Sequence, residues 1–357
     1  MKWLVCHPGA DSSVSDVFAG VTAGLKADGI AYAEFRLDGR IDRAHGWLHY
    51  LWRRTKRSEP GRVWPKPTPA DVLLHASMGL VERALMRNCD AILVITAMYL
   101  QPDMLTLARR AGLQVYLICT ESPYEMVNER RLAALCDVVW TNERTAVPMF
   151  LQVCKRVAYL PAAWLPGVHD RAQVNGTGVA AHDVIFVGTF FEERVKLLEA
   201  VDWTGIDLGL YGNTYMISKR SPLRSCVRGG ITPNAITAGL YRRAKIGLNL
   251  YRQIPADLPA AESLNPRAYE LAAAGVCQVS EERAEAREVF GEAVSTFRTA
   301  GELSQCVRTL LADDEQRGRM GAAARQAVVT STWQSRIQQM RRDLEVREQP
   351  AARSLTA

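Results

Sequence analysis

The stretch Leu258-Pro-Ala-Ala-Glu262-Ser-Leu-Asn265-Pro266-Arg267-Ala-Tyr-Glu270-Leu-Ala-Ala-Ala-Gly275-Val-Cys-Gln-Val-Ser280 decides the fold class. Asn265 is a preferred helix N-cap and Pro266 fits the first helical position, so a helix is predicted over 266–274. Gly275 is typical of a left-handed C-cap, and the apolar run after it predicts a strand over 276–280. A helix that ends in glycine and leads into a buried strand is typical of a parallel α/β sheet.

The same alternation of short apolar runs and amphipathic stretches continues along the chain and predicts an α/β protein with mostly parallel sheets. In the first half, strands are expected near 2–6, 91–95, 114–118, 138–140 and 157–160, and helices over 14–27, 71–87, 103–111, 124–135 and 144–154. In the second half, further strands are expected near 183–188, 207–211, 246–250 and 293–297, and further helices over 303–312 and 332–347.

The length of 357 residues suggests two domains. The apolar pattern breaks between 160 and 182, where prolines and glycines gather, and this break predicts a linker. We therefore expect a first domain over 1–163, a linker over 164–182, a second domain over 183–330 and a closing helix over 331–347. Two α/β domains imply a cleft, with ligands at the carboxyl ends of strands.

Composition excludes several classes of protein. Hydrophobic residues make up 48% and charged residues 23%, which excludes a mainly disordered, collagen-like or disulfide-built chain. Apolar runs fall short of the roughly 18 residues of a membrane span, and the apolar start is too short for a signal peptide. Eight scattered cysteines show neither Cys-x-x-Cys nor zinc spacing. We expect reduced thiols, no metal, a cytoplasmic location and no integral membrane association.

Standard nucleotide-binding motifs do not fit. A P-loop sequence is absent. Gly176-Thr-Gly178 resembles part of a dinucleotide fingerprint, but it precedes a strand where the motif must follow one. A nicotinamide dehydrogenase is therefore not expected.

The predicted 266–274 helix has the chemistry of an anion site. The N–H groups of its first turn attract negative charge, and Arg267 could add a bidentate phosphate contact. Glu262 and Glu270 suit sugar and ribose hydroxyls, which donate hydrogen bonds. The alternative is a plain cap with a surface ion pair between Arg267 and Glu270, which are three residues apart.

A second cluster follows the strand predicted at 183–188. Gly188 ends this strand and Arg194 lies at the start of a helix, an arrangement typical of a diphosphate site. The alternative is an ordinary loop with Arg194 in solvent. Neighbouring strands end at Tyr211-Gly212 and near Asn249.

Together, these motifs resemble the nucleotide-sugar domain of GT-B-fold glycosyltransferases. The similarity is greatest to the group of the spore maturation protein CgeB, through Asn265-x-Arg267-x-x-Glu270, and more distant to family-4 retaining enzymes, through Glu262-(seven residues)-Glu270. It covers about residues 90–340. In the first half, Thr120-Glu121-Ser122-Pro123-Tyr124 resembles the acidic-Ser-Pro loop of the CgeB-like group, with glutamate in place of aspartate.

The resemblance implies two Rossmann-like domains facing across a cleft, with the last helix crossing back to the first domain. It implies transfer of a hexose or pentose from a nucleoside-diphosphate sugar to an acceptor hydroxyl, without metal or further cofactor. Gly188 and Arg194 would hold the diphosphate, Glu270 the ribose and Glu262 the donor sugar, and Arg267 would support the phosphate charge. The remaining donor-site candidates are Tyr211, Gly212, Asn249 and Asn265.

A catalytic base is needed only if the reaction inverts the anomeric centre. Asp11, after the first strand, and Glu121, after a central strand, are the candidates; both could equally be loop caps. Two other functions stay open: a nucleotide-sugar epimerase, and a binding protein that keeps the fold without turnover.

Residues 36–66 account for the net charge of +6, with nine Lys or Arg against three acids. Aromatic residues interleave with these charges, which suits phosphate contact with base stacking or an anionic membrane surface. The alternative is a solvated helix whose tryptophans pack on the core. We expect a macromolecular acceptor: a nucleic acid with a modified base, a protein, or a lipid-linked or surface glycan. Its candidate binding residues are Trp47, Trp52, Arg53, Arg54, Lys56 and Arg57.

Overall fold

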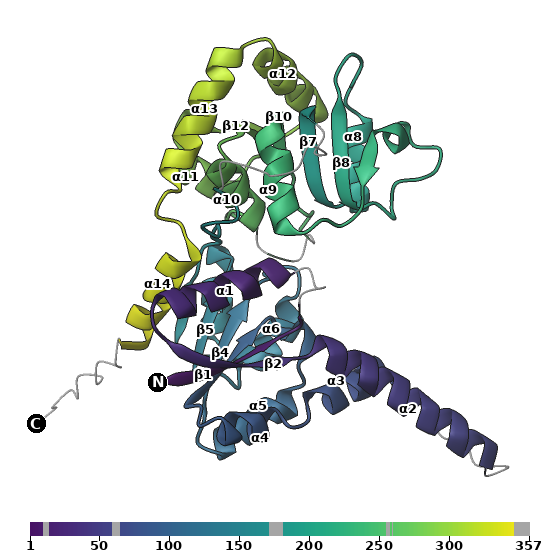
Figure 1. The fold of residues 1–357 in the computed structure, drawn as a ribbon, viewed down its shortest axis with the longest axis vertical. Coiled ribbons are helices and arrows are strands. Elements are labelled where there is room, and N and C mark those ends of the chain that lie inside the picture. The colour runs from purple at the N-terminus through teal and green to yellow at the C-terminus, as the bar shows by residue number, and fades with distance from the viewer. Residues whose placement is uncertain (10–13, 59–64, 171–180, 255–257, 259, 346–357) are drawn as a thin grey trace, which may run out of the picture.

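The computed structural model describes residues 1–9, 14–58, 65–170, 181–254, 258 and 260–345, and it contains two parallel six-stranded sheets. Each sheet forms the centre of one domain, with helices packed on its faces (Figure 1). We call the parts of the chain around the first and second sheets the first and second domains. The predicted α/β class with two Rossmann-like domains is confirmed.

The first sheet has the order β2-β1-β3-β4-β5-β6. Its strands are β1 (Lys2–His7), β2 (Ala31–Arg36), β3 (Ala91–Ile95), β4 (Gln114–Cys119), β5 (Val138–Thr141) and β6 (Val157–Tyr159). The α-helices of this domain are α1 (Ser15–Ala27), α2 (Asp38–Ser58), α3 (Pro69–Ser77), α4 (Leu80–Met86), α5 (Pro102–Arg110), α6 (Met126–Ala133) and α7 (Val147–Leu151). Short 3-10 turns lie at Ala97–Tyr99 and Arg144–Ala146.

The second sheet has the order β12-β11-β10-β7-β8-β9. Its strands are β7 (His182–Thr189), β8 (Leu208–Asn213), β9 (Val227–Gly229), β10 (Ala244–Asn249), β11 (Cys277–Glu281) and β12 (Ser295–Phe297). The α-helices are α8 (Glu192–Glu199), α9 (Asn234–Arg243), α10 (Pro266–Ala274), α11 (Ala284–Phe290), α12 (Ala300–Leu311) and α13 (Asp314–Ala327), with 3-10 turns at Pro222–Cys226 and Gly291–Ala293.

The last helix, α14 (Trp333–Glu345), crosses back to the first domain, as predicted. It packs along α1, and a Cβ atom on Gly20 of α1 would overlap the Trp333 indole. Trp333 and Ile337 join the buried cluster that contains Trp3 of β1. Removing this apolar surface from water fixes the helix on the first domain.

Local signals gave correct helix ends in the second domain. Asn265 caps α10 by accepting a hydrogen bond from Ala268 N at 3.1 Å, and Gly275 adopts φ 74° as its C-cap. In the first domain, the expected helix over 71–87 is wrong. Met78, with ψ 139°, ends α3, and Gly79, in the left-handed region at φ 84°, is the N-cap of α4.

All eight cysteines are free, and most are buried. In the part of the chain that the structure describes, the helices are too short or too polar to cross a membrane.

Candidate functional site

The carboxyl ends of β7 and β8 and the start of α10 lie close together in the second domain. Gly188 lies near the end of β7, opposite Gly212 of β8, which adopts φ 117°. A Cβ atom on Gly212 would overlap the Gly188 carbonyl, and one on Gly188 would overlap the Arg267 guanidinium. We call Gly188, Gly212, Arg267 and Glu270 the α10 cluster. The sequence predicted these residues for the donor site, and the structure places them around the start of α10.

Arg267 lies in the first turn of α10, where its guanidinium group packs against an aromatic ring. Its guanidinium carbon lies 4.9 Å from the Phe186 ring centroid, and Nη1 is 3.5 Å from the Leu250 carbonyl oxygen, at the limit of hydrogen bonding. The side chain is partly exposed. A partly exposed guanidinium group beside the positive end of a nine-residue helix can bind an anion.

Glu270 lies one turn further along α10 and is 8% exposed. Burial raises its pKa to about 7, and the charge of Arg267 opposes this rise. A carboxyl group with this pKa is present in both its protonated and its ionised form at neutral pH. A ligand that donates hydrogen bonds to the ionised form would therefore deprotonate it.

Arg194 is buried at the start of α8, so the alternative of an arginine in solvent does not hold. It donates to the carbonyls of Thr189 at 2.8 Å, Leu250 at 2.9 Å and Tyr251 at 3.2 Å. Burial and the nearby Arg267 lower its pKa to about 9. These bonds tie the ends of β7 and β10 together. Direct contact between Arg194 and a diphosphate stays a prediction.

The Tyr211 hydroxyl and the side-chain nitrogen of Asn249 also have polar partners, whereas Asn249 Oδ1 has none among the described residues. The Tyr211 hydroxyl is 2.8 Å from Nε2 of His182, the first residue of β7, so its ring points back along the strand. Asn249 is fully buried and donates to the hydroxyls of Tyr251 at 3.1 Å and Ser280 at 3.2 Å. Asn249 is the last residue of β10 and Tyr211 lies within β8, and the predicted donor contacts of both stay predictions.

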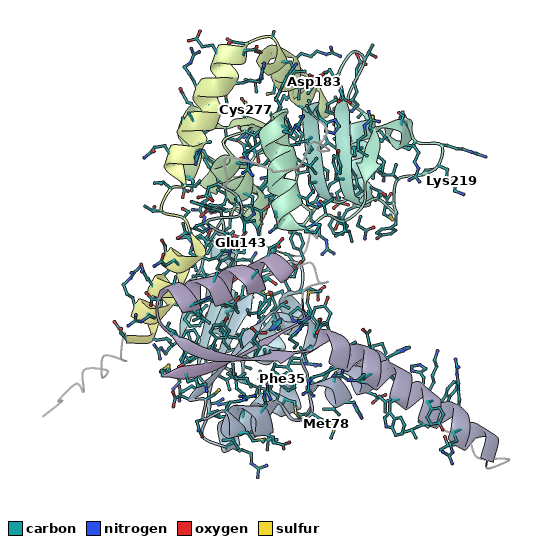
Figure 2. All side chains as sticks on the ribbon, viewed as in Figure 1. Phe35, Met78, Glu143, Asp183, Lys219 and Cys277 are labelled. Atoms are coloured by element: carbon teal, nitrogen blue, oxygen red, sulfur yellow. The ribbon has the colours of Figure 1, made fainter. Side chains whose placement is uncertain are left out.

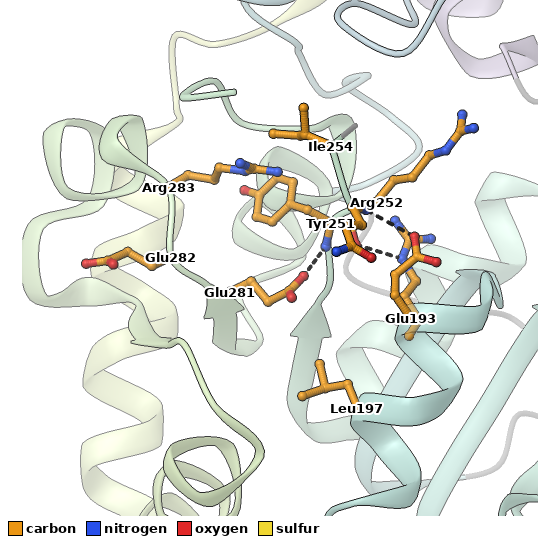
Figure 3. Close-up of a pocket in the computed structure, with 10 residues that line it drawn as sticks. Glu193, Leu197, Tyr251, Arg252, Ile254, Glu281, Glu282 and Arg283 are labelled. Carbon is orange, nitrogen blue, oxygen red and sulfur yellow. Dashed lines mark hydrogen bonds between the residues drawn. The ribbon is translucent and has the colours of Figure 1, made fainter. Parts of the chain in front are cut away.

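A pocket of about 380 Å³, which we call the α8 pocket, opens beside Arg194 (Figure 3). It lies between α8 and the loops that follow β10 and β11. Glu281 of its wall accepts a hydrogen bond from Tyr251 N. Its charged lining residues are Glu193, Arg194, Arg252, Glu281, Glu282 and Arg283. Carboxylates and guanidinium groups together suit a polyhydroxylated, anionic ligand.

The first domain brings Glu121 to the cleft. Burial raises the pKa of Glu121, and the charge of Arg252 in the second domain opposes the rise. Tyr124 of the same loop donates to the Arg252 carbonyl at 2.8 Å. The buried Glu129 holds this loop by accepting from Glu121 N at 3.1 Å and Ser122 Oγ at 2.5 Å. The other predicted base, Asp11, lies outside the described residues.

Glu262 lies in a loop that the first domain holds directly. Its carboxylate accepts from Arg144 Nε at 2.7 Å, and Arg144 also pairs with Glu288 at 2.7 Å. The buried Glu143 accepts from the backbone N–H groups of Glu262 at 3.2 Å and Ser263 at 3.1 Å. Figure 2 places Glu143 where the domains meet. The donor-site loop is therefore fixed from across the cleft.

The sequence interpretation missed Glu143 and Arg144, although they follow β5 directly. The carboxyl end of a central parallel strand is where ligand-facing residues are expected. That position was the signal available. The contacts to Glu262 and Glu288 depend on how the domains pack, and no local pattern shows them.

The predicted acceptor residues lie on α2, which projects from the first domain away from the second (Figure 1). Trp47 is 53% exposed, and Arg53 and Arg54 are exposed, whereas Trp52 is partly buried. The side chains of Lys56 and Arg57 lie outside the described residues. Trp47 also lines a groove of about 810 Å³ between α2 and α3. The alternative of tryptophans packed on the core does not hold for Trp47.

Comparison with known proteins relates part of the chain to a described family and the whole chain to solved structures of the same fold. Residues 194–342 match the model of a family described as glycosyl transferase-like. No curated protein matches the chain with significance.

Solved GT-B structures match nearly the whole chain. Sucrose-phosphate synthase from Thermosynechococcus elongatus superposes with a TM-score of 0.63 at 14% identity, covering 97% of this chain and 98% of that chain. The DNA-modifying enzyme β-glucosyltransferase, studied with and without uridine diphosphoglucose, gives 0.61 at 12% identity, covering 97% and 100%. A trehalose-6-phosphate structure from E. coli bound to UDP-2-fluoro glucose gives 0.65 at 12% identity, covering 97% and 99%. The chain has the GT-B fold.

Proposed function

We propose that this protein is a glycosyltransferase that moves a sugar from a nucleoside-diphosphate sugar to an acceptor hydroxyl. The α10 cluster carries the proposal. A cation, a helix N-terminus and a buried carboxylate meet at the strand ends of the second sheet, and Arg267 and Glu270 fall inside the matched segment 194–342. The motif around Arg267 also supports kinship with the CgeB-like group.

The donor would bind with its diphosphate against Gly188, Arg267 and the start of α10. The two glycines leave room for phosphate oxygens close to the backbone. Glu270 would accept hydrogen bonds from the ribose. The sugar would lie toward Glu262, which is 43% exposed and shares its carboxylate with Arg144.

In the reaction, the bond between the anomeric carbon and the diphosphate oxygen breaks, and a bond to the acceptor oxygen forms. The leaving diphosphate gains negative charge, which Arg267 and the α10 dipole would stabilise without a bound metal. The acceptor hydroxyl loses its proton. If the reaction inverts the anomeric centre, Glu121 would take this proton, since burial raises its pKa toward the range of a general base.

The acceptor is proposed to be a macromolecule. Helix α2, which carries Trp47 and Arg53, projects from the first domain away from the second (Figure 1), and these residues could hold a long, anionic acceptor such as a nucleic acid. Eight free thiols fit a reducing compartment, and we propose that the protein acts in the cytoplasm.

The donor site is tested first by binding. Thermal unfolding is measured with UDP-, GDP-, ADP-, CDP- and dTDP-glucose, because a ligand of the folded state at a hundredfold excess over Kd adds about 2.7 kcal/mol of stability. We expect a selective shift with one nucleotide, lost in Arg267→Ala. Arg319→Ala is the matched control, since the Arg319 side chain is 64% exposed and pairs with Glu315 on its own helix.

Turnover is then followed by mass spectrometry with the selected donor and nucleic-acid, protein or glycan acceptors. Sugar transfer that disappears in Arg267→Ala supports the proposal. The double variant Trp47→Ala, Arg53→Ala is expected to raise KM for the macromolecular acceptor and leave donor affinity unchanged. No shift with any nucleotide sugar would overturn the proposal, and binding without transfer to any acceptor would favour a binding protein.

A further inference from the structure

His169 lies behind the α10 cluster, in the segment that joins the domains, and is 3% exposed. Its Nδ1 accepts a hydrogen bond from Leu165 N at 2.9 Å, so the ring proton of the neutral histidine resides on Nε2. Nε2 has no hydrogen-bond partner within the described ranges. It lies 3.9 Å from the Glu270 carboxylate oxygen Oε1.

The backbone around His169 holds the ring in this orientation. His169 N donates to the Leu165 carbonyl at 3.1 Å, which closes one turn of chain. Arg242 of α9 donates to the His169 carbonyl at 2.6 Å. The imidazole is therefore held at its backbone and at Nδ1, and only Nε2–H is free to bond toward Glu270.

We propose that His169 is a positioning residue that orients the Glu270 carboxylate and keeps it ionised when the nucleotide ribose binds. The proposal rests on the proposed function, because it takes the ribose as the group that Glu270 binds. A movement of about 1 Å by either side chain would bring Nε2–H within hydrogen-bond distance of the carboxylate. Glu270 retains an exposed edge for the ligand, whereas Nε2 has none.

The two groups have protonation states that suit this contact. Burial lowers the pKa of His169 to about 4, so the imidazole is neutral at physiological pH and donates only through Nε2. Burial raises the pKa of Glu270 to about 7. An ionised carboxylate accepts hydrogen bonds from ribose hydroxyls better than a protonated carboxyl group does, because protonation removes part of its acceptor capacity. A hydrogen bond from Nε2–H favours the ionised form and lowers this pKa.

Other charged and titratable groups face the pair from the neighbouring elements. The charge of Arg267 opposes the rise in the pKa of Glu270. The charge of Glu270 contributes to the raised pKa of the buried Tyr241 of α9. The charge of Asp16 of α1 acts to raise the pKa of both His169 and Tyr241. The charge of Arg242 acts to lower the pKa of His169, and the charge of Asp170 acts to raise it. His169 differs from these groups in presenting an unpaired N–H to the carboxylate.

The test compares His169→Phe, which removes the donor, with His169→Gln, whose side-chain amide can restore it. Kd for UDP-glucose, or for whichever of the five nucleotide sugars shifts the melting temperature most, is measured by calorimetry from pH 5.5 to 8.5. A hydrogen bond to a charged group is worth about tenfold or more in affinity, so the phenylalanine variant is expected to bind at least tenfold more weakly at pH 7.

The pH profile separates positioning from simple packing. Affinity falls as pH drops below the pKa of Glu270 in the free protein. In His169→Phe this fall is expected to begin at higher pH, because the carboxylate has lost a stabilising donor, and in His169→Gln it returns toward wild type. Glu270→Gln should abolish the dependence. Equal affinity and an equal profile in both His169 variants, with binding still sensitive to Arg267→Ala, would overturn this inference alone. Absence of binding by the wild type would overturn the proposed function as well.

A measurement on the wild-type protein covers the case in which the variants do not fold. Nitrogen-15 NMR of the six histidines reports the tautomer of each ring. We expect His169 as the Nε2–H tautomer, with this proton moving downfield when UDP-glucose, or the selected nucleotide sugar, is added. An Nδ1–H tautomer, or a signal that does not move at saturation, would refute the role of His169.

Discussion

Replacing Glu143 by alanine is expected to release the donor-site loop from the first domain. Glu143 is 2% exposed, and its carboxylate accepts from Thr145 N at 3.1 Å, Glu262 N at 3.2 Å and Ser263 N at 3.1 Å. It also accepts from the hydroxyls of Thr145 at 3.0 Å and Ser263 at 3.2 Å. One carboxylate therefore joins the loop after β5 to the loop before α10.

The magnitude follows from the donors left behind. Hydroxyl groups can rotate to other acceptors, but the three backbone N–H groups cannot, and each buried donor without a partner costs about 1–3 kcal/mol. Water entering the vacated space offsets part of this cost. We expect a loss of about 3–5 kcal/mol, similar to that for breaking a buried ion pair.

Hydrogen exchange with mass spectrometry resolves this loss locally, which is necessary because a two-domain chain is not expected to unfold in a single step. At about 1.4 kcal/mol per factor of ten, amides of the 261–265 loop should exchange at least about a hundredfold faster in Glu143→Ala, while α12 stays protected. Glu288→Ala is the matched control at the same interface. Because Glu288 is 57% exposed, its ion pair with Arg144 should contribute less than about 1 kcal/mol. A change below threefold at 261–265 in Glu143→Ala would refute this reasoning.

Three further changes test other parts of the structure. Burial raises the pKa of Glu129 to about 7 from 4.5, so the folded protein keeps a proton that the unfolded chain releases, and stability falls as pH rises through this window. Glu129→Gln lacks this dependence, and urea unfolding should show the wild type losing on the order of 3 kcal/mol relative to the variant between pH 4.5 and 7; parallel curves would contradict it. Trp333→Ala should cost about 3–5 kcal/mol and increase exchange in α14 and α1 together; loss confined to α14 would argue against their joint packing. Asn265→Ala should cost about 1 kcal/mol in thermal unfolding, with Asn265→Asp close to wild type; equal losses would mean that the cap contributes nothing.

The sequence was sufficient to predict those elements whose ends are set by capping residues within the element or next to it. The α10 helix begins and ends at its predicted residues because Asn265, Pro266 and Gly275 act on neighbouring backbone groups. Strand β2 escaped prediction since, of its six residues, only Phe35 is buried, so the apolar signal of a central strand is missing. Helix α2 was not predicted as a long element because it is strongly polar and projects from the domain.

The candidate site was predictable where position along a strand decides the outcome. Gly188, Gly212 and Arg267 come together because the carboxyl ends of neighbouring parallel strands lie on the same side of the sheet. The bonding of Arg194 was not predictable, since its carbonyl partners Leu250 and Tyr251 follow β10, which neighbours β7 in the sheet but is remote from it in the sequence. The contact between His169 and Glu270 likewise depends on the path of the joining segment, which has no apolar period.

The polypeptide passes between the domains twice, and the two passages are bonded to each other. Trp164 N donates to the Ser331 carbonyl at 3.1 Å, Trp333 N donates to the Trp164 carbonyl at 3.3 Å, and the Trp164 indole donates to the Val328 carbonyl at 2.7 Å. Mechanically, the second domain is a closed loop inserted into the first. Tension applied between β1 and α14 would pass through the first domain and this short clamp. The second domain would bear no force until the clamp had sheared.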